Sequence, residues 1–117
     1  MKVEINNLVW EIREVETRDV NLLEGENSCY GTCHYYKNVI YLDKSLTEFH
    51  KKRVLAHELT HAYIFSYLLT KQEKYTEEEL CEFVALYGND IWSQVTDYFF
   101  RREIEEDKNK NLNPNKK

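Results

Sequence analysis

The hydrophobic pattern of this chain changes its period near residue 45, and this change limits the fold more than any other feature. Before it, residues 2–5 and 8–15 alternate apolar and polar side chains, as half-buried β-strands do. The Asn-Asn pair between them suits a tight hairpin turn, because asparagine tolerates positive φ. Residues 30–36 and 39–42 are rich in β-forming side chains and predict a second hairpin. The first half is therefore expected to form a small antiparallel sheet of three or four strands.

The second half of the chain has the spacing of helices. Ser45 followed by Glu48 has the spacing of a capping box, so we expect a helix that begins near residue 46 and ends near Leu69. Thr76 can cap a second helix, whose first turn holds three glutamates and whose apolar residues then recur at helical spacing through Phe99. The expected fold class is α+β, with the small sheet packed on two main helices.

Length and composition predict one domain. A chain of 117 residues is long enough for one compact core and too short for two. Residues 1–106 carry the periodic pattern and are expected to form the domain, while residues 107–117 are rich in Lys and Asn and are expected to be a disordered polar tail. The net charge of −5 argues against a nucleic-acid-binding surface.

The sequence also bears on the compartment. It contains no apolar stretch of transmembrane length, and its start does not have the pattern of a signal peptide. Three cysteines, an odd number, fit a reducing compartment better than a disulfide framework. We therefore expect a cytoplasmic protein with neither nucleic acid nor membrane as a partner.

The first expected helix contains the sequence His-Glu-Leu-Thr-His at residues 57–61. Positions i and i+4 lie one turn apart on one helix face, so His57 and His61 can present two imidazole nitrogens to one metal ion. Two neutral imidazoles suit Zn²⁺, and the Glu58 carboxylate is placed to take a proton from a metal-bound water. The alternative is two ordinary core histidines beside a solvated glutamate. Because unpaired polar groups on a buried stripe are costly, the pattern favours a zinc site.

A zinc site of this kind needs a third protein ligand and one open position. The glutamates that open the second helix are the expected source. Glu78 is the predicted ligand, with Glu82 as the carboxylate that orients a ligating histidine; Glu82 as the ligand is the alternative. The alternative is that these glutamates have no role in metal binding and only stabilise the start of the helix, where negative charge complements the helix dipole.

A second cluster of metal-binding residue types lies at Cys29, Cys33 and His34. Its spacing is poor for tetrahedral chelation, which normally uses two cysteines separated by two residues. We therefore expect ordinary hairpin residues at these positions. His50 is expected to be a surface residue of the first helical turn.

Together these features resemble the compact gluzincin-type peptidases, in particular the ImmA/IrrE-like metallopeptidases of phages and integrative elements. The resemblance covers most of the chain, from the short sheet through residues 39–43, the helix with residues 57–61, and residues 78–85. It implies a minimal zincin-like fold, a zinc ion and peptidase activity. In gluzincins the ligand glutamate lies on the next helix, often followed four positions later by a second carboxylate, and Glu78 and Glu82 have that spacing.

The expected function is hydrolysis of a peptide bond in a specific protein target, by Glu58-assisted attack of zinc-bound water. The resemblance implies a repressor or another regulator of a mobile element as the kind of target. The alternative is a non-catalytic, zinc-stabilised binding module that acts as an inhibitor or adaptor on a host or phage protein. An intact Glu58 favours the enzyme, because a structural zinc site does not need a base.

Two further expectations concern the substrate. Enzymes of this kind commonly bind a peptide as an added strand along a sheet edge, and residues 36–42 could supply that edge. A tyrosine or histidine near the metal often polarises the scissile carbonyl, and Tyr63, Tyr67 and Tyr87 are the candidates considered.

Overall fold

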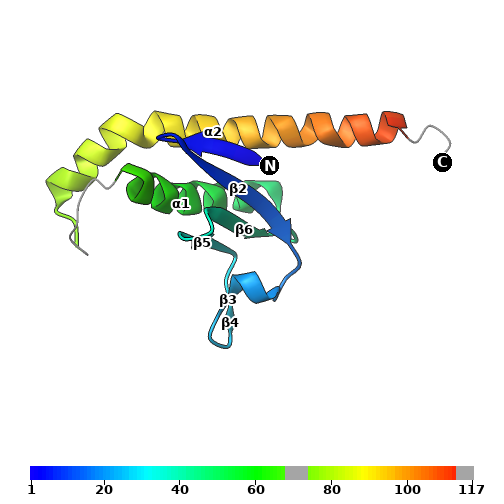
Figure 1. Cartoon of the computed structure of the whole chain (residues 1–117), viewed down its shortest axis with the longest axis horizontal. Coiled ribbons are helices and arrows are strands. Elements are labelled where there is room, and N and C mark those ends of the chain that lie inside the picture. The colour runs from blue at the N-terminus through cyan, green and yellow to red at the C-terminus, as the bar shows by residue number, and fades with distance from the viewer. Residues whose placement is uncertain (68–73, 113–117) are drawn as a thin grey trace.

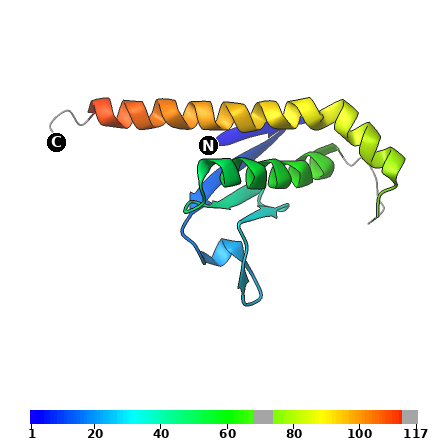
Figure 2. The same cartoon turned by 180° about the vertical axis from the view of Figure 1, so that it is seen from behind.

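A computed structural model describes residues 1–67 and 74–112 of the chain. One helix packs against a sheet, and a longer helix runs alongside the first and extends past the sheet (Figure 1, Figure 2). The elements, in chain order, are β1 (Lys2–Ile5), β2 (Leu8–Val15), the 3-10 helix η1 (Val20–Leu22), β3 (Leu23–Glu24), β4 (Asn27–Ser28), β5 (Gly31–His34), β6 (Val39–Asp43), α1 (Glu48–Tyr67) and α2 (Glu77–Leu112).

The main sheet has four strands in the order β1-β2-β6-β5. Both predicted hairpins are present, because β1 pairs antiparallel with β2 and β5 pairs antiparallel with β6. The two central strands, however, run parallel, with Glu11 opposite Val39 and Val15 opposite Asp43. The α+β class is confirmed, but the sheet is mixed rather than antiparallel throughout. The long connection from β2 to β6 allows this, since a parallel neighbour needs a crossover of a dozen residues or more.

Asparagines make the hairpin turns. Asn6 and Asn7, between β1 and β2, have φ values of 48° and 67°. Asn38, between β5 and β6, has a φ of 53°. Left-handed backbone of this kind matches the twist of a two-residue hairpin, and asparagine adopts it at less cost than most residues. The local sequence therefore fixes where both hairpins turn.

The segment between β2 and β5 covers the sheet face opposite α1. Its η1 turn buries Leu22 against Val39 and Tyr41 of β6. The Thr32 hydroxyl of β5 donates to the Asn21 carbonyl at 2.7 Å, which fixes this turn to the edge strand. Beyond η1 the strands β3 and β4 form a small two-stranded sheet that projects beside β5 (Figure 1).

Helix α1 begins at Glu48. The expected capping box at Ser45 does not form, because the Ser45 hydroxyl donates instead to Asp43 at 2.7 Å. The Thr47 hydroxyl accepts from the His50 backbone N–H at 3.3 Å and takes the capping position. The helix is described to Tyr67, and the expected end near Leu69 lies outside the described residues.

Helix α2 begins as the sequence predicts. The Thr76 hydroxyl accepts from the Glu79 backbone N–H at 3.1 Å, and the Glu79 carboxylate accepts from the Thr76 N–H at 3.1 Å. This reciprocal pair is a capping box. The helix continues to Leu112, so residues 107–112 of the expected tail are helical, while residues 113–117 lie outside the described residues. Pro114 is the first residue in this part that cannot continue a helix, whereas charged residues and asparagine can.

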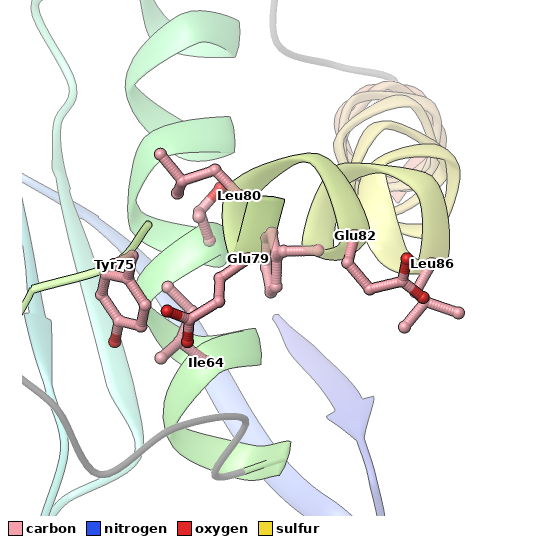
Figure 3. Close-up of a pocket in the computed structure, with 8 residues that line it drawn as sticks. Ile64, Tyr75, Glu79, Leu80, Glu82 and Leu86 are labelled. Atoms are coloured by element: carbon pink, nitrogen blue, oxygen red, sulfur yellow. The ribbon is translucent and has the colours of Figure 1, made fainter. Parts of the chain in front are cut away.

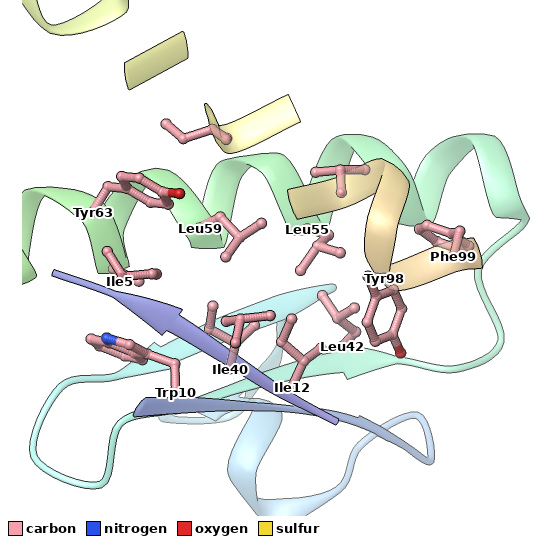
Figure 4. Packing of buried hydrophobic residues seen from close by; sticks show 14 residues of the cluster. Ile5, Trp10, Ile12, Ile40, Leu42, Leu55, Leu59, Tyr63, Tyr98 and Phe99 are labelled. Atoms are coloured by element: carbon pink, nitrogen blue, oxygen red, sulfur yellow. The ribbon is translucent and has the colours of Figure 1, made fainter. Parts of the chain in front are cut away.

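The core lies between the sheet and the two helices (Figure 4). The β-strands contribute Trp10, Ile12, Ile40 and Leu42, each at most 2% exposed, and α1 contributes Leu55 and Leu59, both at 0%. The α2 side chains in this cluster are Ile91, Val95, Tyr98 and Phe99. The predicted apolar stripe of α2 is therefore buried only in its second half, because Leu80 and Val84 are 50% and 63% exposed. In the part of the chain that the structure describes, neither helix has the length and apolarity to span a membrane.

One carboxylate is held inside this framework by several cations and hydroxyls. Glu14 of β2 pairs with Lys51 of α1, whose side chain is 3% exposed, at 2.5 Å. Tyr98 of α2 donates its hydroxyl to Glu14 at 2.5 Å, and Arg102 approaches the same carboxylate at 2.8 Å. Burial alone would raise the pKa of Glu14, but the hydrogen bonds from Lys51 and Tyr98 lower it below the usual range. This cluster ties the sheet to both helices.

Candidate metal centre

The helical spacing of α1 brings His57, Glu58 and His61 together. The ligand atoms of these three side chains all lie within 4.8 Å of one another. The two imidazole rings have centroids 5.0 Å apart and are inclined by 71°. Among the residues that the structure describes, this is the one group of three or more His, Cys, Asp or Glu side chains with such mutual proximity.

Glu58 is a buried carboxylate that the chain leaves without a partner. Its side chain belongs to a residue that is only 7% exposed, and none of the described residues donates a hydrogen bond to it or forms an ion pair with it. Burial raises the pKa of Glu58, the nearby His57 opposes this, and the Glu24 carboxylate adds to the rise. A carboxylate in this state is suited to accept a proton from a bound water.

The pKa of His61 is shifted toward the form that a metal requires. Partial burial and the neighbouring His57 lower the pKa of His61, which favours the neutral imidazole. A neutral imidazole has one free lone pair and is the usual zinc ligand. The donor set of two imidazoles beside a buried carboxylate therefore fits a zinc ion.

The edge strand β5 lies directly against this part of α1. A Cβ added to Gly31 would meet Val54 Cγ1 at 2.6 Å and Glu58 Cγ at 3.1 Å, so only glycine permits this approach. Cys33, two residues along on the same strand face, packs against the core, and its pKa is raised to about 12 by burial and by the Glu58 charge. Strand alternation thus directs every second residue of this segment toward the helix.

Tyr35 continues this alternation just past the end of β5 and reaches His61. The Tyr35 hydroxyl lies 3.3 Å from His61 Nδ1. The Tyr35 ring also packs on Phe65, with centroids 5.1 Å apart and planes inclined by 31°. Sequence reasoning missed Tyr35, although its even spacing from Gly31 and Cys33 along a strand was the available signal.

The three tyrosines considered earlier pack with one another instead. Tyr63 is 4% exposed within the core, and its ring centroid lies 6.1 Å from those of both Tyr67 and Tyr87. The Tyr67 and Tyr87 rings are 4.6 Å apart. These contacts join the end of α1 to the first part of α2. Among the tyrosines that the structure describes, Tyr35 is the one in contact with the histidine pair.

Hollows lie on both sides of Glu58. One, of about 560 Å³, is bounded by the β3–β5 segment and includes Glu24, Cys29, Tyr35 and both histidines in its wall. The other, of about 330 Å³, lies toward the start of α1 and is lined by Tyr30, His50 and Arg53. Both hollows are lined by Gly31, His57 and Glu58, so they adjoin each other at these residues and form a cleft beside Glu58.

The second cluster of metal-binding residue types does not join the site as ligands. Cys29 and Cys33 line the larger hollow, but neither belongs to the group of close ligand atoms. His34 points to the other sheet face, where its Nε2 lies 3.0 Å from the Asn21 carbonyl. His50 is half-buried and its ring packs on Tyr30 at 5.0 Å.

The predicted third ligand lies at the start of α2. Glu78 and Glu82 are both exposed, and neither is in the group of close ligand atoms. Glu82 and Glu79 line a hollow between the helices that also contains Thr60 and Ile64 of α1. In Figure 3 the Glu79 carboxylate is directed toward Ile64 and Tyr75, while Glu82 extends toward Leu86. The structure thus brings the two histidines and Glu58 together, but not the third ligand.

Comparison with known proteins identifies the family of this chain. Residues 15–88, more than half of the chain, match the peptidase family whose domain is described as IrrE N-terminal-like. The matched range runs from the end of β2 through the histidine pair to the first turns of α2. No curated protein and no solved structure gives a significant match. The chain belongs to this family of metallopeptidase-like domains.

Proposed function

We propose that this chain is a zinc-dependent metallopeptidase in which His57 and His61 hold the metal and Glu58 is the general base. One observation carries the proposal: the ligand atoms of His57, Glu58 and His61 lie within 4.8 Å of one another, and the buried Glu58 receives no hydrogen bond from the described residues. A zinc ion bound there would activate a water molecule and polarise the scissile carbonyl. The membership in a peptidase family supports this function.

The roles of the chain's own residues follow from their places. Glu58 accepts a proton as the peptide bond is attacked and returns it to the departing amine, and the pKa rise caused by burial favours the first of these transfers. The cleft extends on both sides of Glu58, so it has room for substrate residues before and after the cleaved bond. This shape supports cleavage within a chain rather than removal of a terminal residue.

The substrate-binding edge differs from the one that the sequence suggested. Residues 36–42 include most of β6, which is buried and lies between β2 and β5. The edge strands of the sheet are β1 and β5, and β5 is the one beside Glu58 and His61. We therefore propose that the peptide adds to β5 through backbone hydrogen bonds.

The third ligand remains a proposal, with the first turns of α2 as its source. The sequence favours Glu78 with Glu82 as the alternative, and the hollow between the helices supports Glu82 and adds Glu79. Zinc titration of Glu78→Gln, Glu79→Gln and Glu82→Gln against a competing chelator ranks them. Substitution of the true ligand should abolish zinc binding, whereas substitution of an orienting residue should weaken zinc binding by about 10- to 100-fold. Zinc affinity equal to that of wild type in all three variants would exclude the first turns of α2 as the source of the third ligand.

We also propose a regulatory protein as the target and the cytoplasm as the compartment. A repressor or another regulator of a mobile element is the kind of target that the family resemblance implies. The three cysteines are all free thiols, which supports a reducing compartment such as the cytoplasm.

The Glu58→Gln variant tests the proposed activity. Zinc-loaded wild type and variant are incubated with a mixed peptide library, and cleavage is followed by mass spectrometry. The variant should bind zinc normally and cleave at least about 10²- to 10⁴-fold more slowly, because the base is lost while side-chain volume is kept. Cleavage at equal rates would exclude Glu58 as the base, and no cleavage by wild type would favour the binding module.

A further inference from the structure

The contact between Tyr35 and His61 involves Nδ1 of the imidazole ring and leaves Nε2 as the nitrogen available to a metal. The Tyr35 hydroxyl lies 3.3 Å from His61 Nδ1, and the two rings meet edge to face with centroids 6.5 Å apart. We infer that Tyr35 is a positioning residue, which holds the His61 ring in the tautomer and orientation needed for metal binding. This inference rests on the proposed zinc site.

The tautomer of His61 decides which atom donates in this contact. An imidazole that binds a metal through Nε2 carries its proton on Nδ1. The Nδ1–H then donates to the Tyr35 hydroxyl oxygen. If Nδ1 instead accepts from the hydroxyl, the proton sits on Nε2 and this nitrogen has no lone pair for a metal. Tyr35 therefore supplies the acceptor that stabilises the metal-binding tautomer.

Tyr35 is itself well held, which a positioning residue requires. Its ring packs on Phe65, one turn beyond His61 on α1, with centroids 5.1 Å apart. Its backbone follows directly after His34, the last residue of β5, which pairs with Val39 of β6. The Tyr35 phenol can accept a hydrogen bond as well as donate one. Ring and hydroxyl are thus fixed by the sheet and the helix together.

The two histidines differ in this respect. Among the described residues no hydrogen bond reaches the His57 ring, which meets His61 in an edge-to-face contact. Only His61 has a hydroxyl at its second nitrogen. Loss of the Tyr35 hydroxyl should therefore loosen one ligand and leave the other unchanged.

The test compares Tyr35→Phe with Tyr36→Phe. Phenylalanine at residue 35 keeps the ring that packs on Phe65 and removes only the hydroxyl, while Tyr36 is 100% exposed and serves as the matched control. Zinc affinity is measured by competition with a chelator, and the ring protons of His61 are assigned by nitrogen-15 NMR. Thermal unfolding of the metal-free proteins reports any general loss of packing.

We expect zinc to bind Tyr35→Phe about 10- to 100-fold more weakly than wild type, with the control unchanged and the metal-free melting temperatures equal. In zinc-loaded wild type the His61 proton should be on Nδ1 and should exchange with water more slowly than in Tyr35→Phe. Equal zinc affinity in the two variants, or a proton on Nε2 in zinc-loaded wild type, would overturn the inference alone. Absence of zinc binding in wild type would overturn the proposed function and this inference with it.

Discussion

Glu14 and Glu58 are both largely buried carboxylates beside α1, and the chain treats them in opposite ways. Glu14 accepts hydrogen bonds from Lys51 and Tyr98 and forms an ion pair with Arg102, and its pKa is lowered. Glu58 receives no hydrogen bond from the described residues, and burial raises its pKa. Glu58 is 7% exposed and the Glu14 side chain 14%, so the difference lies in the partners that the described residues supply.

This contrast separates a structural cluster from a functional one. A buried charge that the chain satisfies completely joins elements together, and here it links the sheet to both helices. A buried charge that the chain leaves unsatisfied costs stability, unless something outside the chain completes it. The two imidazoles beside Glu58 indicate that the missing partner is a metal with its bound water.

The largest stability effect expected is that of Glu14→Gln. The change leaves the Lys51 ammonium buried without its counter-charge, and breaking such a pair costs about 3–5 kcal/mol of unfolding free energy. Urea unfolding of the metal-free protein measures the loss. Glu11→Gln on the same strand is the control, because its pair with Arg13 is exposed and solvent screening leaves it with little effect on stability.

Zinc affinity should stay unchanged in Glu14→Gln, since the Glu14 cluster is no part of the histidine group. Glu58→Gln should show the opposite profile, with the unfolding free energy of the metal-free protein retained or increased and activity lost. A large stability loss in Glu58→Gln, or none in Glu14→Gln, would erase the distinction between the two carboxylates.

A smaller effect is expected from Gly31→Ala. The added methyl group would lie 2.6 Å from Val54 and 3.1 Å from the Glu58 side chain, so β5 and α1 must move apart. Overpacking of this kind costs about 1–3 kcal/mol. Circular dichroism melts give the stability, and zinc titration shows whether the histidine pair moves with the helix. Gly88→Ala is the control, because this glycine lies inside α2, where alanine favours the helix by about 1 kcal/mol. An unchanged melt for Gly31→Ala would show that the strand is not held as closely as described.

Much of the site could be predicted because it is local. His57 and His61 are one helical turn apart, and the α1 pattern around them is clear in the sequence. The Thr76–Glu79 capping box and the asparagine turns are likewise set by neighbours in the chain. Such features depend on a few residues within one element, which is the range over which sequence patterns are informative.

What could not be predicted depends on how distant segments meet. The parallel pairing of β2 with β6 follows from the path of a long connection, not from the residues of either strand. The contact of Tyr35 with His61 requires β5 to lie against α1. The third ligand depends on how the first turns of α2 sit beside α1, which the spacing of the glutamates along α2 does not determine.

The metal content of the purified protein tests the account most directly. Elemental analysis should find about one zinc per chain in wild type and in His50→Ala, which changes a histidine on the same helix outside the close group. The His57→Ala and His61→Ala variants should each lose the zinc, because two imidazoles on one helix face carry the site. Equal zinc in wild type and His61→Ala, or no zinc in wild type after loading, would contradict the account.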